Sequence, residues 1–394
     1  MNLEKTRYLI VGSGFFGATI AERIANDLNE PVVILEKRRH FGGNSFSEID
    51  PETGIEYHKY GSHIFHTNNK FVWEYINKFS KFNQYRHRVW TTFGRKVYSM
   101  PINLATINQY YQKALSPSEA RDFLKNEISR DKVEHPTNLE EQAVSLIGRP
   151  LYEAFIRGYT LKQWETDPKK LPTGIITRLP VRYDYNDRYF SDIFEGIPLE
   201  GYTGIFKKML NHHNISLNLN VDFFEVKDKI PPDCLIIYTG PIDRYFDFKH
   251  GELTWRTIDL EKEIVATPDF QGTSVMNYAE ESVPFTRIHE FKHFHPERKH
   301  TDTHTLIFRE FSRFAKKTDE PFYPINLEAD KKIYAAYRTE AEQLKNVIFG
   351  GRLGSYKYYD MHQAIGAALL VYNRDIKPRA TGVPYKSPIE DFGQ

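Results

Sequence analysis

Residues Tyr8–Gly17 read YLIVGSGFFG, and this stretch decides the fold. Its first four residues form an apolar run typical of a buried parallel strand, and the last six fit the pattern G-x-G-x-x-G. Ala18–Ala25 then places alanines on one side of a predicted helix. A strand, a glycine turn and a helix in this order bind the pyrophosphate of a dinucleotide at the helix N-terminus, where free N–H groups and the positive dipole end meet it. We therefore predict a Rossmann-like dinucleotide site; a purely structural glycine turn is the alternative.

The next strand narrows the choice of dinucleotide. Val32–Leu35 is apolar and is followed by Glu36, 24 residues after Gly12, where an acid that binds the ribose is expected. Residues 36–44 read EKRRHFGGN and resemble the E-x-R-x-x-x-G-G extension of FAD-binding enzymes of the glutathione-reductase and amine-oxidase type. An ordinary basic loop with two glycines is the alternative. We expect FAD as the cofactor.

Composition sets outer limits on the function. The 394 residues suffice for two or three domains, and a formal net charge of +1 argues against binding nucleic acid or an acidic membrane over the whole surface. No apolar run reaches ~18 residues, so no transmembrane helix is expected, and the first strand begins too early to leave room for a signal peptide. The single Cys234 excludes an intrachain disulfide; we interpret it as a packing residue and expect a reducing, cytoplasmic location.

The middle of the chain changes its pattern. Capping patterns at Ser116–Glu119 and Thr137–Glu140 predict a bundle of helices over about 105–165. A Pro- and Gly-rich stretch follows a predicted helix break at Gly158, and it is a candidate mobile lid. Alternating residues over 252–314 then predict a half-solvated antiparallel sheet.

A second strand–glycine–helix unit lies near the C-terminus, with a strand at 347–351 and a helix from about Met361 to Tyr372. FAD folds commonly use such a unit to place N–H groups against the flavin ring. We therefore predict an α/β fold in which a Rossmann-like FAD-binding domain carries an inserted helical bundle and an antiparallel β-sheet domain. The expected boundaries are 1–80, 205–245 and 345–375 for the FAD domain, 105–200 for the helical domain with a lid around 158–180, 85–103 and 250–325 for the sheet domain, and 378–394 for a poorly ordered tail.

Three histidines, His58, His63 and His66, raise the question of a metal site. They fall in residues 54–67, which we interpret as a loop with a short hairpin. No cysteine or second ligand cluster lies nearby in the sequence, so we expect no metal.

Several long segments together resemble bacterial UDP-galactopyranose mutase. They include GGNSFSEIDPETGIEYHKYGSHIFHT (42–67), GYTLKQWETDP (158–168), TRLPVRYDYNDRYF (177–190), PFTRIHEFKHF (284–294) and FGGRLGSYKYYDMHQAIG (349–366). The resemblance extends to about residue 373 and is more specific than the glycine pattern. It implies an isomerase that interconverts UDP-galactopyranose and UDP-galactofuranose for cell-surface glycans. The fold that it implies is a Rossmann-like FAD domain, a helical domain and a six-stranded antiparallel sheet.

The resemblance also implies the residues of the site. Arg178 and Arg287 correspond to two arginines that bind the diphosphate, a role that suits the planar, bidentate guanidinium. His63 corresponds to a histidine that lies against the flavin, and these three are the expected catalytic residues. The expected substrate-binding residues are Phe155, Tyr159, Thr160, Trp164, Arg178, Tyr189, Asn277, Arg287, Tyr323 and Tyr358. The expected cofactor-binding residues are Gly12, Ser13, Gly14, Phe15, Phe16, Gly17, Glu36, Lys37, Arg38, Gly43, Asn44, Ser45, His63, Ile64, Val221, Thr239, Gly240, Arg352, Tyr359, Asp360 and Met361.

The implied chemistry is nucleophilic, although the cofactor is a flavin. FAD must be reduced, with NAD(P)H or dithionite as the external reductant, and N5 of the reduced flavin attacks the anomeric carbon and expels UDP. The two arginines would stabilise the growing charge of the leaving UDP. Relatives that also accept the N-acetylated sugar carry Arg at the position of His63, so we expect UDP-galactose alone as the substrate.

Two other functions stay open. An FAD-dependent oxidase or desaturase of the amine-oxidase type would share the glycine pattern and the 36–43 extension, but it would not need a pocket for a pyrophosphate. A nucleotide-sugar-binding flavoprotein with a regulatory role would show no turnover. We expect no nucleic-acid partner and no membrane span, and a homodimer is left open because the sequence does not give the oligomeric state.

Overall fold

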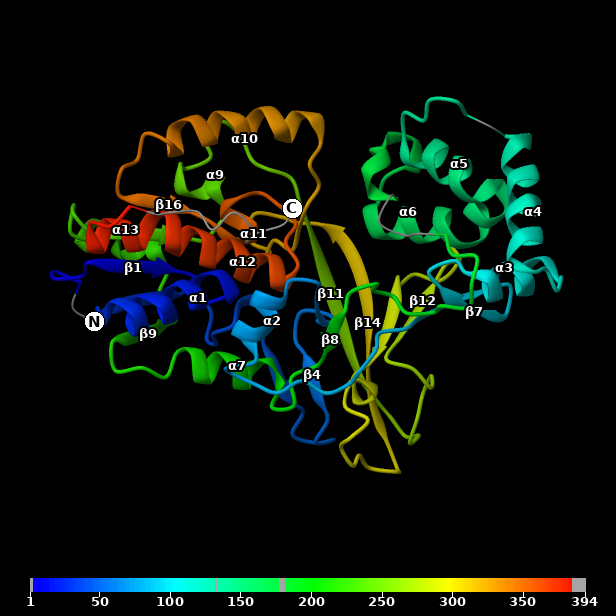
Figure 1. The fold of residues 1–394 in the computed structure, drawn as a ribbon, viewed down its shortest axis with the longest axis horizontal. Helices are drawn as coiled ribbons and strands as arrows, with labels where there is room; N and C mark the ends of the chain where they lie inside the picture. Colours follow the sequence, from blue (N-terminus) through cyan, green and yellow to red (C-terminus); the bar gives the residue numbers. More distant parts are fainter. Residues whose placement is uncertain (1–2, 132, 177–180, 385–394) are drawn as a thin grey trace.

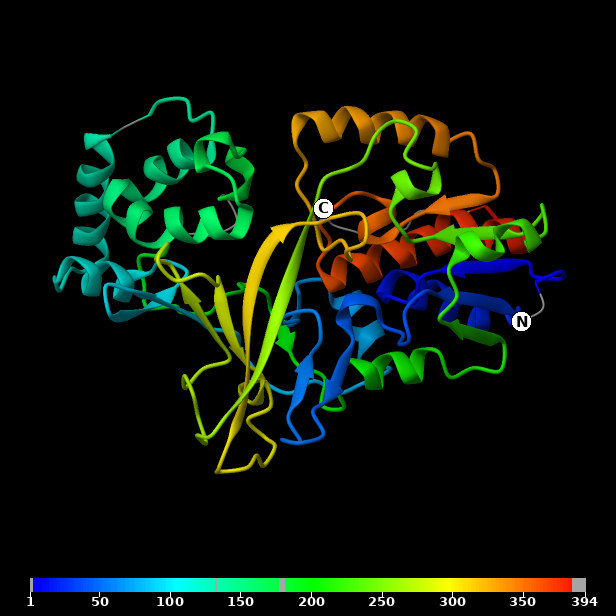
Figure 2. The ribbon, with the colours of Figure 1, turned by 180° about the vertical axis from the view of Figure 1, so that it is seen from behind.

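The computed structural model describes residues 3–131, 133–176 and 181–384. Parallel strands and their helices form one lobe, and helices α3 (Leu104–Tyr111) to α6 (Gly158–Trp164) form another. The long strands β11 (Trp255–Val265) and β14 (Thr305–Phe314) run between the two lobes (Figures 1 and 2). No helix in the described part of the chain is long and apolar enough to cross a membrane.

In the described part of the chain, five parallel strands form the first sheet, in the order β16-β10-β1-β2-β9. Their bounds are β1 Tyr8–Val11, β2 Val32–Glu36, β9 Ile215–Leu219, β10 Leu235–Tyr238 and β16 Val347–Phe349. Ile10 packs in a core with residues of α1 (Phe15–Arg23) and α12 (Met361–Val371), whereas its neighbour Leu9 packs with Cys234 in another. Successive residues thus enter different cores, because a parallel sheet is buried on both faces. Burial raises the pKa of the Cys234 thiol to about 12, as suits a packing residue.

The backbone geometry of the turn after β1 requires glycine. Gly12 has φ +99°, a left-handed conformation that favours glycine. A Cβ on Gly17 would lie 2.1 Å from the Gly12 carbonyl oxygen, so only glycine allows the turn to close onto α1. The predicted strand, glycine turn and helix are confirmed.

Further helices cover this lobe. They are α2 Lys70–Ile76, α7 Gly201–Met209, α8 Phe223–Val226, α9 Ile242–Tyr245, α10 Glu328–Ala341, α11 Gly351–Gly354 and α13 Lys377–Thr381. The extended conformation of β9 does not continue into residues 223–226, because Asp222 accepts a hydrogen bond from the Phe224 N–H and begins α8. Of the predicted tail, residues 385–394 lie outside the described part of the chain.

The second sheet contains seven strands within the described residues, in the order β15-β11-β14-β13-β12-β6-β7. The bounds not yet given are β6 Val89–Phe93, β7 Lys96–Met100, β12 Val275–Tyr278, β13 Arg287–Glu290 and β15 Tyr323–Pro324. The expectation of six antiparallel strands needs correction. Strands β6 and β12 pair in parallel, and β6 joins this sheet from a segment that precedes the helical lobe. Two small antiparallel pairs are formed by β3 (Ser47–Ile49) with β4 (Glu56–His58) and by β5 (Phe65–Thr67) with β8 (Phe194–Gly196).

The helical lobe contains α3, α4 (Pro117–Arg130), α5 (Leu139–Leu151) and α6, with a π-helical stretch at Tyr152–Arg157 between the last two. The capping box predicted at Ser116 is confirmed. At α5 the cap is one residue later than predicted, because the Asn138 side chain accepts from the Glu141 N–H while Thr137 donates to the Glu141 carboxylate.

Gly158 does not break the helix, contrary to the prediction. Its φ and ψ of −67° and −37° are helical, and the chain continues into α6. A Cβ at Gly158 would lie 2.3 Å from the Ala279 carbonyl oxygen, so the glycine serves a close approach of α6 to the β12–β13 connection. Lys162 donates from Nζ to the carbonyl oxygens of Tyr278 and Glu280 and holds the same contact. The predicted lid therefore begins with an anchored helix.

Candidate active site

The first cavity lies at the carboxyl ends of the parallel strands, where open α/β sheets bind ligands. It has a volume of about 210 Å³ and is lined by the glycine turn, by Glu36–Arg38 and by Thr239 and Gly240 after β10. Every predicted cofactor residue lines it except Ile64 and Asp360, which line a second cavity instead.

Glu36 is fixed at the end of β2. Its Oε2 accepts from the Ser13 N–H at 3.0 Å and from the Ser13 hydroxyl at 2.7 Å, and its Oε1 accepts from the Arg38 N–H at 3.0 Å. Glu36 is only 5% exposed. Because a carboxylate can accept about four hydrogen bonds, this buried acid retains capacity for a hydroxyl donor in the cavity.

Arg38 brings a positive charge to the same wall. Its Nη2 donates to Glu320 Oε2 at 2.7 Å and to Asn44 Oδ1 at 2.9 Å. Its Nη1 is buried and has no hydrogen-bond partner among the described residues. An unpaired buried guanidinium N–H is costly, so the site fits a ligand with an anionic or carbonyl oxygen at this point.

The second cavity has a volume of about 390 Å³ and lies between the helical lobe and the second sheet. The predicted substrate residues that line it are Phe155, Tyr159, Thr160, Trp164, Tyr189, Asn277, Arg287, Tyr323 and Tyr358. Arg178, the remaining one, lies outside the described residues. His63, Arg352 and Met361 line both cavities, so the two meet at these side chains.

The walls of the second cavity differ in chemistry. The helical lobe contributes apolar side chains, among them Leu139, Ile147 and Phe155. The sheet contributes Arg287 and Asn277, whose Oδ1 is buried without a hydrogen-bond partner in the part of the chain that the structure describes. Such a cavity can hold a ligand with a flat apolar end and an anionic end.

Arg287 is held by a buried network. Its Nε lies 3.2 Å from Oε1 of Glu310, its cross-strand neighbour on β14, and its Nη2 donates to the Tyr159 hydroxyl. Burial would raise the pKa of Glu310, but the Arg287 guanidinium and the hydrogen bond from His289 more than offset this effect and bring it to about 2. The carboxylate is therefore ionised at neutral pH and fixes the guanidinium.

His289 extends the network toward the first cavity. Burial lowers its pKa, so the ring is neutral at neutral pH. Its Nε2 lies 2.9 Å from Glu310 Oε2 and must donate, because a carboxylate only accepts. Its Nδ1 therefore accepts from the Ser62 hydroxyl at 2.6 Å. This chain of bonds connects Arg287 with the loop that carries His63.

His63 stands where the two cavities meet. Its Nδ1 lies 2.7 Å from the Gly61 carbonyl oxygen, so this nitrogen carries the proton and Nε2 keeps its lone pair. Burial lowers the pKa of His63 to about 4, although the bond to the carbonyl acts in the opposite direction. The ring is thus a neutral group at neutral pH.

Two tyrosines and an arginine form the remaining polar wall. The rings of Tyr323 and Tyr358 stack with centroids 5.7 Å apart, and the Arg352 guanidinium lies 5.6 Å and 4.9 Å from these centroids. Arg352 is oriented by donating from Nη2 to the Tyr359 carbonyl oxygen at 2.6 Å. Burial raises the pKa of both tyrosines, so their hydroxyl groups stay protonated and can donate to a ligand.

Comparison with known proteins decides the family. A family model described as UDP-galactopyranose mutase matches residues 154–358, and one described as an NAD(P)-binding Rossmann-like domain matches residues 10–79. The chain is 42% identical over 367 residues to the dTDP-fucopyranose mutase of Escherichia coli, covering 92% of this chain and 96% of that protein. It is also 42% identical over 367 residues to the probable UDP-galactopyranose mutase of Klebsiella pneumoniae, covering 93% and 94%. The chain belongs to the UDP-galactopyranose mutase family.

A crystal structure of reduced UDP-galactopyranose mutase has the same fold, with a TM-score of 0.70 at 15% identity over 97% of this chain and 98% of that one. The predicted family, its isomerase class and the α/β fold with a Rossmann-like domain are confirmed. The roles of the individual site residues stay predictions.

Sequence reasoning for this mutase-family chain missed several lining residues. Arg244 and Glu320 line the first cavity, and His87 lines the second. Arg244 lies in IYTGPIDRYFD (237–247), a further segment that resembles the mutase family and could have pointed to this residue. Glu320 and His87 belong to no motif. Glu320 is placed by its ion pairs with Lys37 at 2.9 Å and with Arg38.

Proposed function

We propose that this protein interconverts UDP-galactopyranose and UDP-galactofuranose with the help of reduced FAD. The observation that carries the proposal is the junction of two cavities at His63, Arg352 and Met361, with the fixed cation Arg287 lining the second. A cofactor in one cavity and a nucleotide sugar in the other could meet at this junction. Membership in the mutase family supports the same reaction.

The first cavity suits FAD. The glycine turn allows a pyrophosphate to approach the N-terminus of α1, Glu36 can accept from a ribose hydroxyl, and the unpaired Nη1 of Arg38 can donate to an oxygen of the cofactor. When bound and reduced, FAD supplies N5, the nucleophile for the anomeric carbon of the sugar. The reductant would be external, NAD(P)H or dithionite, because the rearrangement has no net redox change.

The chain's own part is to bind, orient and stabilise charge. Arg287, held by Glu310, would pair with the diphosphate and stabilise the charge that grows on the leaving UDP. The hydroxyl groups of Tyr323 and Tyr358 would donate to the same group, and the apolar wall around Phe155 would cover the base. Arg178 is expected to join Arg287 in this role.

A second nucleotide sugar, dTDP-fucose, is also a candidate substrate. Identity to the dTDP-fucopyranose mutase is the same, 42%, as to the probable UDP-galactopyranose mutase. dTDP differs from UDP by a methyl group on the base and by the absence of the ribose 2′-hydroxyl, and fucose lacks the hydroxyl at C6 of galactose. The apolar wall with Leu139 and Ile147 would accept that methyl group. The argument from His63 concerns the N-acetyl group alone and does not distinguish UDP-galactose from dTDP-fucose.

Product analysis tests the proposal. Purified protein that contains FAD is reduced with dithionite and mixed with UDP-galactofuranose, and the nucleotide sugars are separated by chromatography. We expect UDP-galactopyranose from the reduced protein and none from the same protein kept oxidised. A higher kcat/KM for dTDP-fucofuranose than for UDP-galactofuranose would favour the second substrate. No conversion of either compound by the reduced, flavin-loaded protein would overturn the proposal.

A further inference from the structure

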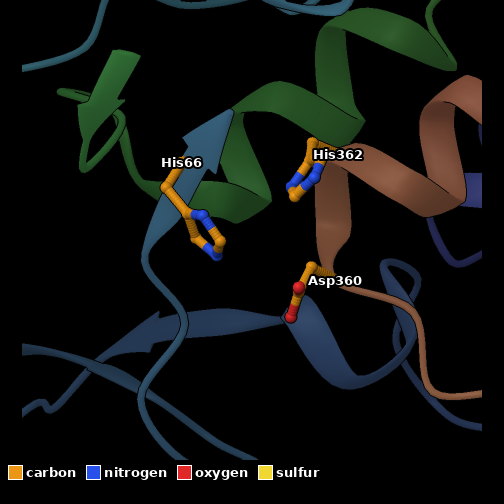
Figure 3. Close-up of side chains that lie close together, drawn as sticks. All are labelled: His66, Asp360 and His362. Atoms are coloured by element: carbon orange, nitrogen blue, oxygen red, sulfur yellow. The ribbon is translucent and has the colours of Figure 1, made fainter. Parts of the chain in front are cut away.

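Two histidines and a carboxylate that are far apart in the sequence converge beside the second cavity. His66 is on β5, Asp360 is the N-cap residue of α12, and His362 is in the first turn of α12 (Figure 3). One ligand atom from each residue lies within 4.8 Å of the other two. Figure 3 shows the two rings and the carboxylate arranged around one space. In the sequence His66 is close to His58 and His63, but in the structure it lies with other residues. The rings of His58 and His63 lie near each other, whereas His66 joins Asp360 and His362.

The His66 ring is held so that one nitrogen is available. Its Nδ1 lies 2.7 Å from Asp192 Oδ2, and it must be the donor when the ring is neutral, because the carboxylate only accepts. This bond leaves Nε2 with a free lone pair. The Phe190 ring stacks on His66 at a centroid distance of 3.6 Å and fixes the plane of the imidazole. A carboxylate behind a histidine is the usual way in which proteins orient a metal-binding imidazole.

His362 has an unsatisfied nitrogen. Its Nδ1 is buried and has no hydrogen-bond partner within residues 3–131, 133–176 and 181–384. An unpaired buried nitrogen costs free energy in the empty protein, and a ligand in the cluster would recover part of that cost.

The charge of the cluster also favours a cation. It brings together the carboxylates of Asp360 and Asp192, and neither forms an ion pair with a lysine or arginine of the described chain. A second group, Asp269, Glu290 and His293, has comparable spacing. There Lys292 Nζ lies 3.3 Å from Asp269 and 3.4 Å from Glu290 and already supplies the positive charge.

We propose that His66, Asp360 and His362 form a binding site for a divalent transition-metal ion, with Zn²⁺ as the best match. Two imidazole nitrogens and one carboxylate oxygen are a ligand set that Zn²⁺ accepts, and three protein ligands leave one coordination position open. His66 and Asp360 line the second cavity, so the open position faces the space in which a nucleotide sugar would lie. The site does not depend on the proposed mutase reaction.

Zinc binding to the full chain tests this inference. The protein is freed of metal with a chelator and titrated with Zn²⁺ alone, in competition with a chromogenic chelator. We expect one equivalent to bind at micromolar or lower Zn²⁺ concentrations and to raise the thermal unfolding temperature, because the ion binds only the folded protein. X-ray absorption of the loaded protein should show two imidazole ligands.

Matched variants locate the ion. His362→Asn and Asp360→Asn should each lower the affinity for Zn²⁺ at least tenfold, and Asp192→Asn, which removes only the negative charge behind His66, should lower it by about ten- to a hundredfold. His293→Asn changes the second group and should leave the affinity unchanged. Failure of the wild-type protein to bind Zn²⁺ would overturn the proposal, and so would binding that His362→Asn does not weaken. Should the variants unfold, an absorption spectrum of the wild-type protein without imidazole ligands would also overturn it.

Discussion

The Nε of Arg287 lies 3.2 Å from Oε1 of Glu310, directly across the β13–β14 pair, and Arg287 also lines the second cavity. Glu310 is 4% exposed and also accepts from His289. The arginine is thus fixed from behind before any ligand arrives. A fixed cation loses little conformational entropy when it binds a diphosphate, which is why preorganised charge is effective in catalysis.

Arg287→Lys keeps the positive charge but loses the planar fork. We expect kcat/KM to fall by about 10- to 150-fold, equivalent to about 1.5–3 kcal/mol for charge-assisted hydrogen bonds, with an unchanged flavin spectrum. Steady-state assays with reduced enzyme and UDP-galactofuranose measure this change. Arg309→Lys is a matched control on β14, because Arg309 pairs with Glu263 at the protein surface. Equal turnover in Arg287→Lys and wild type would refute the role of Arg287.

The same ion pair predicts how stability depends on pH. Burial would raise the pKa of Glu310, but Arg287 and His289 bring it to about 2, below its ordinary value of 4.5. Ionised Glu310 therefore stabilises the fold at every pH above about 4.5, and this contribution is lost as the pH falls toward 2. The contribution of ionised Glu310 to the free energy of unfolding is roughly 3 kcal/mol.

Glu310→Gln should therefore unfold at lower urea than wild type at pH 7, and its urea midpoint should fall less between pH 5 and pH 3. Urea unfolding at a series of pH values, followed by circular dichroism, measures both quantities. Parallel curves for the two proteins across the acidic range would show that Glu310 does not titrate as stated.

Removal of the Glu36 carboxylate tests the proposal that the first cavity binds FAD. Glu36→Ala should weaken FAD binding by ~1.5–3 kcal/mol, because the acid is placed to accept from a ribose hydroxyl. The flavin content of the purified protein and the dissociation constant of added FAD measure the effect. Ser13→Ala is the control. It removes the hydroxyl that donates to Glu36 Oε2 at 2.7 Å but keeps the Glu36 carboxylate, so it should weaken FAD binding less than Glu36→Ala does. Wild-type flavin affinity in Glu36→Ala would contradict the assignment.

Local features of this chain could be predicted from the sequence, and long-range ones could not. The Tyr8–Val11 strand, its glycine turn and the Ser116 cap follow from neighbouring residues alone. The pairing of Arg287 with Glu310 depends on the register of two strands, which the alternating pattern does not give. His66 and His362 meet only because β5 lies beside α12. The family resemblance named most residues that line the first cavity but fewer than half of those that line the second, and residues outside its motifs, such as Glu320, were missed.

Gly158 is another residue whose long-range contact could not be predicted from the sequence, and its substitution provides a test of stability. A helix interior favours alanine over glycine, yet a Cβ here would lie 2.3 Å from the Ala279 carbonyl oxygen. Gly158→Ala should therefore destabilise the protein by about 1–3 kcal/mol, as overpacking does. Gly366→Ala in α12 is the matched control, because its Cβ would meet Val72 at an ordinary 3.7 Å. It should be neutral or stabilising in the same thermal unfolding assay, and equal effects of the two changes would contradict the packing argument.

Trp164 offers a signal for ligand binding in the second cavity. It lies at the end of the anchored helix α6 and lines the cavity, partly buried against the helical lobe. UDP should displace water from the indole, so we expect a UDP-dependent change in tryptophan fluorescence. Trp164→Phe is the control, because three other tryptophans contribute to the emission. A change of wild-type size in Trp164→Phe would assign the signal to another residue.

The variant Arg178→Ala tests whether the predicted lid closes on the diphosphate. Leu171 and Ile176 are buried in the core of the helical lobe, so this part of the predicted lid is packed against the lobe. Closure would thus concern the residues around Arg178, which lie outside the described residues. Loss of the Trp164 signal in Arg178→Ala at saturating UDP is the expected result. A full-size signal in that variant would mean that the base, bound along Phe155 and Tyr159, changes the indole's surroundings without the arginine.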